Sequence, residues 1–61
     1  MKFVVELFAK ESKESEKVMR FTYTVEQENK ELAISEAKEL QATHPNYPIV
    51  DEDSPVTALV S

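Results

Sequence analysis

Two stretches near the start of the chain, residues 2–10 and 17–25, alternate in side-chain character with the two-residue period of a β-strand. The second stretch is also rich in the β-branched and aromatic residues that favour strands. One face of the two stretches carries only apolar and aromatic side chains: Phe3, Val5, Leu7, Ala9, Met19, Phe21, Tyr23 and Val25. We therefore predict two antiparallel strands with one face directed at the core.

The segment between these stretches, ESKESE, is polar and charged. It lacks the Asn-Gly type of pair that a two-residue hairpin turn requires, so we predict a longer loop over residues 12–16. Placing Leu7 opposite Phe21 sets apolar residues against each other along both strands, and it also sets Lys2 against Glu26 as a favourable charge pair. The alternation alone leaves a neighbouring register open.

From Asn29 onward the period changes to that of an α-helix. One side of this helix would carry Ala33, Ile34, Ala37, Leu40 and Gln41. Asn29 is a suitable N-cap, because its side-chain oxygen can accept a hydrogen bond from the first turn. Pro45 disfavours the helical conformation in the residue before it, so the helix should end near Thr43. The small alanines predict close docking of the helix on the sheet face that carries Leu7.

The remainder of the chain completes the sheet. Residues 56–60 alternate again, and Ile49-Val50 is a short extended piece that leaves a further strand open. We predict a single α+β domain over residues 1–61 with the element order β-β-α-β. Its three-stranded, mainly antiparallel sheet would have the strand order 2-1-3, with the helix packed on one face. A chain of this length buries only about 60% of the surface that its unfolded form exposes, so its stability has little margin.

Several kinds of functional site are excluded by residues that the chain lacks. It contains no glycine, which excludes the glycine-rich phosphate-binding loops. It contains no cysteine and one histidine, which excludes a metal site built from soft ligands. The acidic run at residues 51–53 lacks the spacing and the turn glycine of an EF-hand, and His44 is explained more simply by the favourable dipole at a helix C-terminus. We therefore predict a non-enzymatic protein without a cofactor or metal.

Location and charge restrict the partners further. Glu6 interrupts the apolar N-terminal run before it reaches the length of a signal-peptide core or a membrane span. The absence of cysteine fits a reducing compartment, so we expect a cytoplasmic protein that does not engage a membrane. The formal net charge of −5 opposes direct binding to nucleic acid.

Two surfaces remain for a protein partner. The sheet face opposite the helix would expose an apolar patch with one arginine: Val4, Phe8, Val18 and Arg20, with Leu59 beside them if the last strand joins the sheet. We expect Arg20 to stack over Phe8 across the strands. A second, acidic surface would comprise Glu28, Glu36, Glu39, Asp51, Glu52 and Asp53. Solubility is the simpler explanation of the acidic surface.

We accordingly expect a small protein-interaction module that acts as a homodimer or by docking on a larger protein. Self-association is expected through the apolar sheet face or through the sheet edge beside it. The alternative is an acidic inhibitor or nucleic-acid mimic, of the type found among accessory proteins of phages and mobile elements, that binds a basic host protein. High salt should weaken the acidic mode of binding and leave the apolar mode intact.

Overall fold

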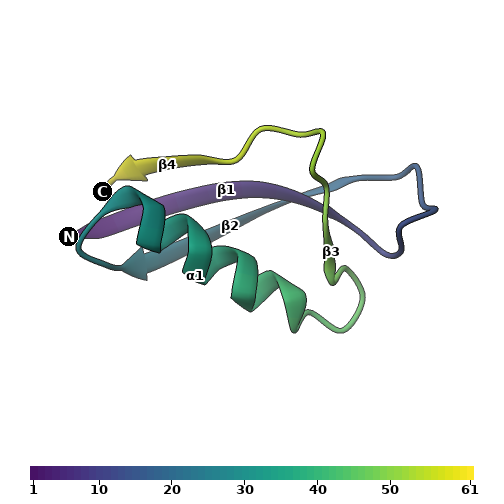
Figure 1. Ribbon diagram of the computed structural model, residues 1–61, viewed down its shortest axis with the longest axis horizontal. Coiled ribbons are helices and arrows are strands. Elements are labelled where there is room, and N and C mark those ends of the chain that lie inside the picture. Colours follow the sequence, from purple (N-terminus) through teal and green to yellow (C-terminus); the bar gives the residue numbers. More distant parts are fainter.

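The computed structural model covers residues 1–61 and contains one helix and four strands. In chain order the elements are β1 (Lys2–Lys10), β2 (Met19–Glu26), α1 (Lys30–Ala42), β3 (Ile49–Val50) and β4 (Thr57–Val60). The four strands form one sheet, and α1 lies across one face of it (Figure 1). The predicted α+β class and its element order are confirmed.

Strand β1 is the centre of the sheet. It pairs with β2 along one side and with both β3 and β4 along the other, and every pairing is antiparallel. The predicted order 2-1-3 is therefore confirmed, with one addition: the extended piece at residues 49–50 forms a short strand of its own, so the sheet has four strands.

The register of β1 and β2 is the predicted one, with Leu7 opposite Phe21 and Lys2 opposite Glu26. The loop between the strands is longer than predicted. It spans residues 11–18, because the ladder ends at the pair of Ala9 with the first residue of β2. Beyond that pair the charged segment stays in water, where its side chains remain solvated, so Val18 belongs to the loop and not to the strand.

The hydrophobic core lies between α1 and the sheet. It is built from eight buried residues: Phe3, Val5, Leu7, Ala9, Val25, Ala33, Ala37 and Ala58. Ala33 and Ala37 of α1 are fully buried, because a methyl side chain lets the helix approach the strands closely. The helix thus docks on the predicted face of the sheet. Phe21 and Tyr23 of β2 are only half-buried, at the margin of this core.

Both ends of α1 are capped by side chains. The Asn29 side chain accepts a hydrogen bond from the Leu32 backbone N–H at 2.9 Å, as predicted for the N-cap. At the other end the Thr43 hydroxyl donates to the Leu40 carbonyl at 2.8 Å, and the helix stops at Ala42. No helix of the structure has both the length and the apolar character needed to span a bilayer.

Candidate interaction surfaces

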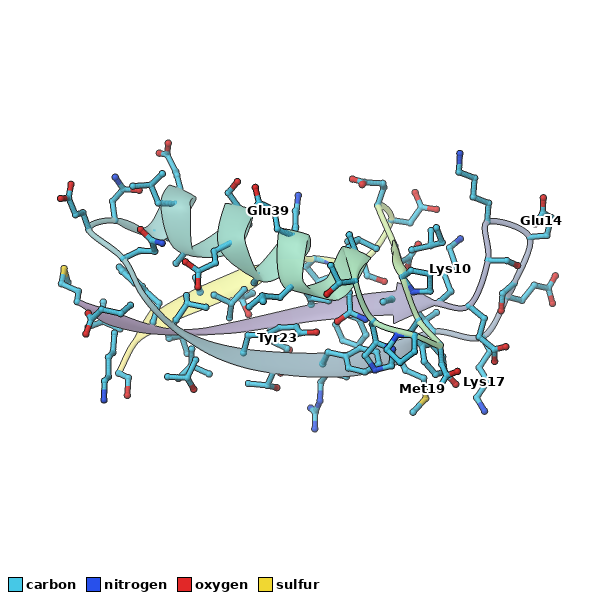
Figure 2. All side chains as sticks on the ribbon, turned by 90° about the horizontal axis from the view of Figure 1, so that it is seen from below. Lys10, Glu14, Lys17, Met19, Tyr23 and Glu39 are labelled. Atoms are coloured by element: carbon cyan, nitrogen blue, oxygen red, sulfur yellow. The ribbon has the colours of Figure 1, made fainter.

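The face of the sheet opposite α1 has no cover. In Figure 2 the helix lies above the sheet, and no segment of the chain lies below it. We call this side the open face. Cross-strand pairing aligns its residues in rows, from Val4 with Thr24 and Leu59, through Glu6 with Thr22 and Thr57, to Phe8 with Arg20.

The apolar part of the open face centres on β1 and β4. Leu59 is 71% exposed and lies opposite Val4, which is half-buried, as is Phe8. Val18 is also partly exposed, but it lies in the hairpin loop outside the ladder. The structure therefore brings Val4, Phe8 and Leu59 onto one face, and it places Val18 at the margin of that face.

Arg20 does not stack on Phe8 as expected. Its guanidinium Nη1 lies 3.7 Å from the Glu6 Oε2, and no cation–π contact with Phe8 is present. The carboxylate offers an opposite charge on the same face, diagonally across the strands, and attracts the guanidinium more strongly than a ring does. This ion pair is exposed, so it contributes little to stability.

The structure divides the predicted acidic surface into three groups. Four of the six residues are exposed to solvent: Glu28, Glu39, Glu52 and Asp53. Glu36 is half-buried and accepts a hydrogen bond from the Gln27 side chain. Asp51 is only 8% exposed, which corrects its assignment to a surface that meets a partner.

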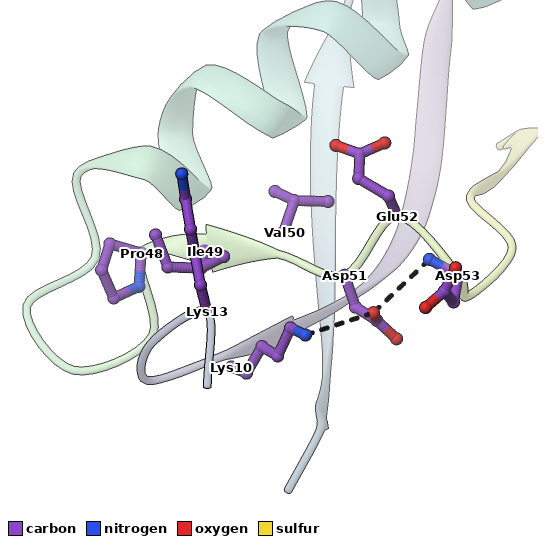
Figure 3. Close-up of a pocket in the computed structure, with 8 residues that line it drawn as sticks. All are labelled: Lys10, Lys13, Pro48, Ile49, Val50, Asp51, Glu52 and Asp53. Carbon is purple, nitrogen blue, oxygen red and sulfur yellow. Dashed lines mark hydrogen bonds and ion pairs between the residues drawn. The ribbon is translucent and has the colours of Figure 1, made fainter. Parts of the chain in front are cut away.

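Asp51 organises the turn that follows β3. Its carboxylate accepts a hydrogen bond from the Ser54 hydroxyl. It also accepts one from the Asp53 backbone N–H and lies 3.8 Å from the Lys10 Nζ (Figure 3). The Ser54 hydroxyl, together with the Asp53 N–H and the charge of Lys10, holds the pKa of Asp51 below its ordinary value against the opposing effect of burial. The residue is buried because the turn folds around its carboxylate.

One hollow of about 380 Å³ lies beside this turn. Its walls come from β1, the hairpin loop and the segment around β3 (Figure 3): Lys10, Lys13, Pro48, Ile49, Val50, Asp51, Glu52 and Asp53. Charges of both signs line it, and Lys10 is paired with Asp51. The structure gathers no group of three or more His, Cys, Asp or Glu side chains that could hold a metal ion. The lining of the hollow contains no serine, threonine, cysteine or histidine.

The single histidine has a structural environment. The Nδ1 of His44 accepts hydrogen bonds from the backbone N–H groups of Asn46 and Tyr47, at 3.1 and 3.0 Å. Its ring packs edge-on against Phe21, with the centroids 5.0 Å apart, and also meets the Tyr47 ring. These contacts fix the connector from α1 to β3.

Gln41 links three segments beneath the helix. It is fully buried, accepts a hydrogen bond from the Tyr23 hydroxyl, and donates to the Tyr47 carbonyl. Burial also raises the pKa of Tyr23. The helical period placed Gln41 on the inner side of α1, but its partners are distant in sequence, and no local pattern identifies them.

Comparison of the chain with protein-family models, with curated proteins and with solved structures found no match. The function must therefore be inferred from the surfaces described above.

Proposed function

We propose that this protein is a non-enzymatic interaction module that binds another polypeptide through the open face of its sheet. One observation carries the proposal: α1 covers one face only, and the other presents Leu59 at 71% exposure opposite Val4, with Phe8 on the same face beyond the row of Glu6. Apolar side chains on a sheet face that nothing covers are typical of a protein contact. The partner is either a second copy of the chain or a larger protein.

Energetics support the same function. The buried core contains only eight residues, four of them alanines, so the domain has little apolar burial of its own. Each square ångström of apolar surface removed from water on association contributes roughly 25 cal/mol. On the open face, Leu59 is the large apolar side chain that is most available for this burial.

The test uses a substitution that leaves the fold intact. Leu59→Lys places a charge on the open face at a position that is already exposed, and Ser35→Lys on the exposed side of α1 adds the same charge elsewhere. A photo-crosslinking residue at position 8 reports on contacts of this face, and one at Glu39 reports on the acidic surface. The readout is crosslinking in a lysate of the native cells at low and high salt.

The proposal expects a crosslink from position 8 to one defined protein, either this chain or another, that persists in high salt. Leu59→Lys should abolish it, and Ser35→Lys should not. Crosslinks from position 39 alone that disappear in high salt would overturn the proposal in favour of the alternative. Absence of any crosslink from position 8 would overturn it as well.

The second candidate function is an acidic inhibitor or nucleic-acid mimic that binds a basic host protein. Its support is the net charge of −5 and the exposure of four acidic residues, Glu28, Glu39, Glu52 and Asp53. The geometry supports it less well, because Asp51 is engaged within its own turn and Glu36 is hydrogen-bonded to Gln27.

A further inference from the structure

Strand β2 forms one edge of the sheet along its whole length. The Gln27 N–H donates to the Met1 carbonyl at 3.0 Å, which fixes the phase of hydrogen bonding between β2 and β1. In an antiparallel ladder these bonds come from alternate residues, so the odd-numbered residues of β2 bond to β1. The backbone N–H and C=O groups of four residues therefore point away from the sheet: Arg20, Thr22, Thr24 and Glu26.

The opposite edge of the sheet is much less suited to pairing. It consists of β3, with two residues, and β4, with four, and the turn around Asp51 separates them. Strand β2 has eight residues, and it contains no proline and no lysine. Proline and lysine are among the residues by which proteins protect a strand edge from pairing. The long edge at β2 is thus the one open to another strand.

The sequence of β2 is complementary to itself when it is reversed about Tyr23. With Tyr23 of two copies opposite each other, Arg20 of one lies opposite Glu26 of the other, and Thr22 lies opposite Thr24. All four are residues whose backbone groups point outward, so the register that matches the side chains also matches the hydrogen bonds. Opposite charges and paired threonines are favourable cross-strand neighbours.

Other registers of the same two strands lose this match. A shift by one residue would oppose outward-pointing groups to groups already bonded to β1. A shift by two in one direction would set Arg20 opposite Thr24 and Glu26 opposite Val18. A shift by two in the other direction would set Glu26 opposite Thr22, and Arg20 opposite Glu28, which lies beyond the end of β2. Registers that centre on Arg20 or on Glu26 would oppose like charges. Tyr23 is therefore the one centre that pairs Arg20 with an acidic residue within β2.

We propose that two copies of this chain pair edge to edge through antiparallel β2 strands centred on Tyr23, which joins their sheets into one of eight strands. This inference goes beyond the proposed function, because it concerns the edge of the sheet and not its open face, and it names a second copy as the partner of this edge. The two-fold axis is perpendicular to the sheet, so both helices lie on the same side of the joined sheet, and the two open faces become continuous.

The side of α1 next to β2 supports this arrangement. Residues 32, 36 and 40 follow one stripe of the helix. Glu36 in that stripe is hydrogen-bonded to Gln27, directly after β2, so the stripe faces the β2 side of the molecule. Leu32 and Leu40 flank Glu36 there at 46% and 43% exposure. The two-fold axis would bring the leucines of the two helices to face each other.

Contacts within one copy leave the charged ends of β2 available. Arg20 is near Glu6, and Glu26 lies 2.7 Å from the N-terminal amino group of Met1, but all four groups are substantially exposed. Exposed ion pairs hold their side chains weakly, so they can reorient toward a second copy. The net charge of −5 on each copy opposes association, and the two local Arg20–Glu26 pairs offset part of that repulsion.

Charge exchange across the interface gives a direct test. Arg20→Glu alone and Glu26→Arg alone each oppose like charges at both ends of the paired strands, whereas a mixture of the two variants restores opposite charges at both ends. Each substitution changes the net charge by two units in opposite directions, so the mixed pair carries the same total charge as the native pair. Sedimentation velocity at about 5–200 μM protein measures association, and circular dichroism checks the fold of each variant.

We expect the native chain to dimerise and each variant alone to dissociate with a constant raised about tenfold or more, since two favourable pairs become two repulsive ones. The mixture should recover the native constant. Amide exchange provides a readout that needs no substitution, because the N–H groups of Thr22 and Thr24 should become protected as the concentration rises. A native chain that is monomeric throughout, or a mixture that associates no better than the single variants, overturns the β2 pairing.

These outcomes separate the inference from the proposed function. If the native chain dimerises, the charge exchange has no effect and Leu59→Lys abolishes the dimer, then the copies meet through the open face. That result overturns the β2 pairing and leaves the proposed function in place. If the β2 dimer forms and position 8 crosslinks to nothing, the pairing is supported and the open-face function fails.

Discussion

At the scale of single residues, two buried polar side chains link segments that are distant in sequence. Gln41 joins α1 to β2 and to the connector before β3, and Asp51 joins the turn after β3 to β1. Every buried side-chain nitrogen or oxygen in the structure has a hydrogen-bond partner. Loss of one partner would leave another polar group unpaired in the interior, which costs more than the bond itself contributes.

Gln41→Leu should lower the free energy of unfolding by about 1–3 kcal/mol, because the Tyr23 hydroxyl and the Tyr47 carbonyl would lose their partner while the volume stays similar. Urea denaturation followed by circular dichroism measures the change. Ala42→Leu, at the next and exposed position of α1, is the control and should leave the midpoint nearly unchanged. Equal midpoints for Gln41→Leu and the native chain would contradict a stabilising role for this network.

Asp51 makes stability depend on pH. Its pKa in the folded protein lies below the value of about 3.9 for an unfolded aspartate. Its contribution is therefore complete above the unfolded pKa and is lost as the pH falls through the folded pKa. Ser54→Ala removes the hydrogen bond that lowers this pKa most, so this variant should be less stable than the native chain at neutral pH and approach it in acid.

Urea midpoints between about pH 7 and pH 2.5 test this, since that range covers the titration of carboxylates. Ser35→Ala on the exposed side of α1 serves as the control, and its difference from the native chain should not vary with pH. A difference between Ser54→Ala and the native chain that stays constant across the whole range would show that the serine acts without the carboxylate.

At the scale of elements, alternation and helical period were sufficient to predict the two long strands and the helix. The continuous apolar face of both strands excludes a shift of the register by one residue, which would turn that face to water. The observed register was chosen from the remaining ones because it also sets Lys2 opposite Glu26. The length of the hairpin loop was not predictable, since Lys17 and Val18 fit the alternating pattern but lie beyond the last ladder pair. Strand β3 has only two residues, which is too short for an alternating pattern to predict it.

The start of α1 offers a test at this scale. Asn29→Ala removes the acceptor for the Leu32 N–H and should lower the free energy of unfolding by about 1 kcal/mol. Asn29→Ser, which keeps a capping oxygen, should recover most of the loss. Chemical denaturation measures both variants. An alanine variant as stable as the native chain would mean that water satisfies the first turn equally well.

The two faces of the sheet should respond differently to a charge. Leu7→Asp should unfold the domain, because Leu7 is fully buried under α1 and the charge would have no partner. Phe21→Asp should also destabilise it strongly, since the Phe21 ring packs against His44 and Tyr47. Thr24→Asp, on the open face of the same sheet, is the control and should keep a cooperative thermal transition in circular dichroism. A native-like transition for Leu7→Asp would invert the assignment of the faces.

At the scale of the whole molecule, the sequence predicted which side chains face which side but not what they touch. The open face was predictable because one helix can cover only one side of a sheet. The Arg20–Glu6 pair was not predictable, because it joins side chains of separate strands that lie diagonally across from each other. The burial of Asp51 was not predictable either, because a run of three acidic residues is typical of a solvated turn and does not show which carboxylate the turn encloses. The charge on the whole molecule, by contrast, follows from composition alone.

Repulsion among the excess acidic groups should weaken as salt is added. Between about 0.01 M and 0.1 M ionic strength the screening length falls from about 30 Å to about 10 Å. The longest dimension of the molecule is 35 Å, so only the higher salt screens charges across it. We expect the urea midpoint to rise over this range. Glu39→Gln, which removes one exposed negative charge, should show a smaller rise, and a midpoint that falls with salt would mean that attractive pairs dominate.

The chain ends meet at one end of the sheet, where the Ser61 N–H donates to the Lys2 carbonyl at 2.8 Å, and the hairpin loop lies at the other end (Figure 1). A short linker between the ends and new ends within the loop would therefore give a circularly permuted chain with the same strand neighbours. In that chain the central strand β1 would come last. Its pairing with β2, now the most local in the sheet, would become the most distant in sequence, so the contact that now closes the shortest loop would close the longest one.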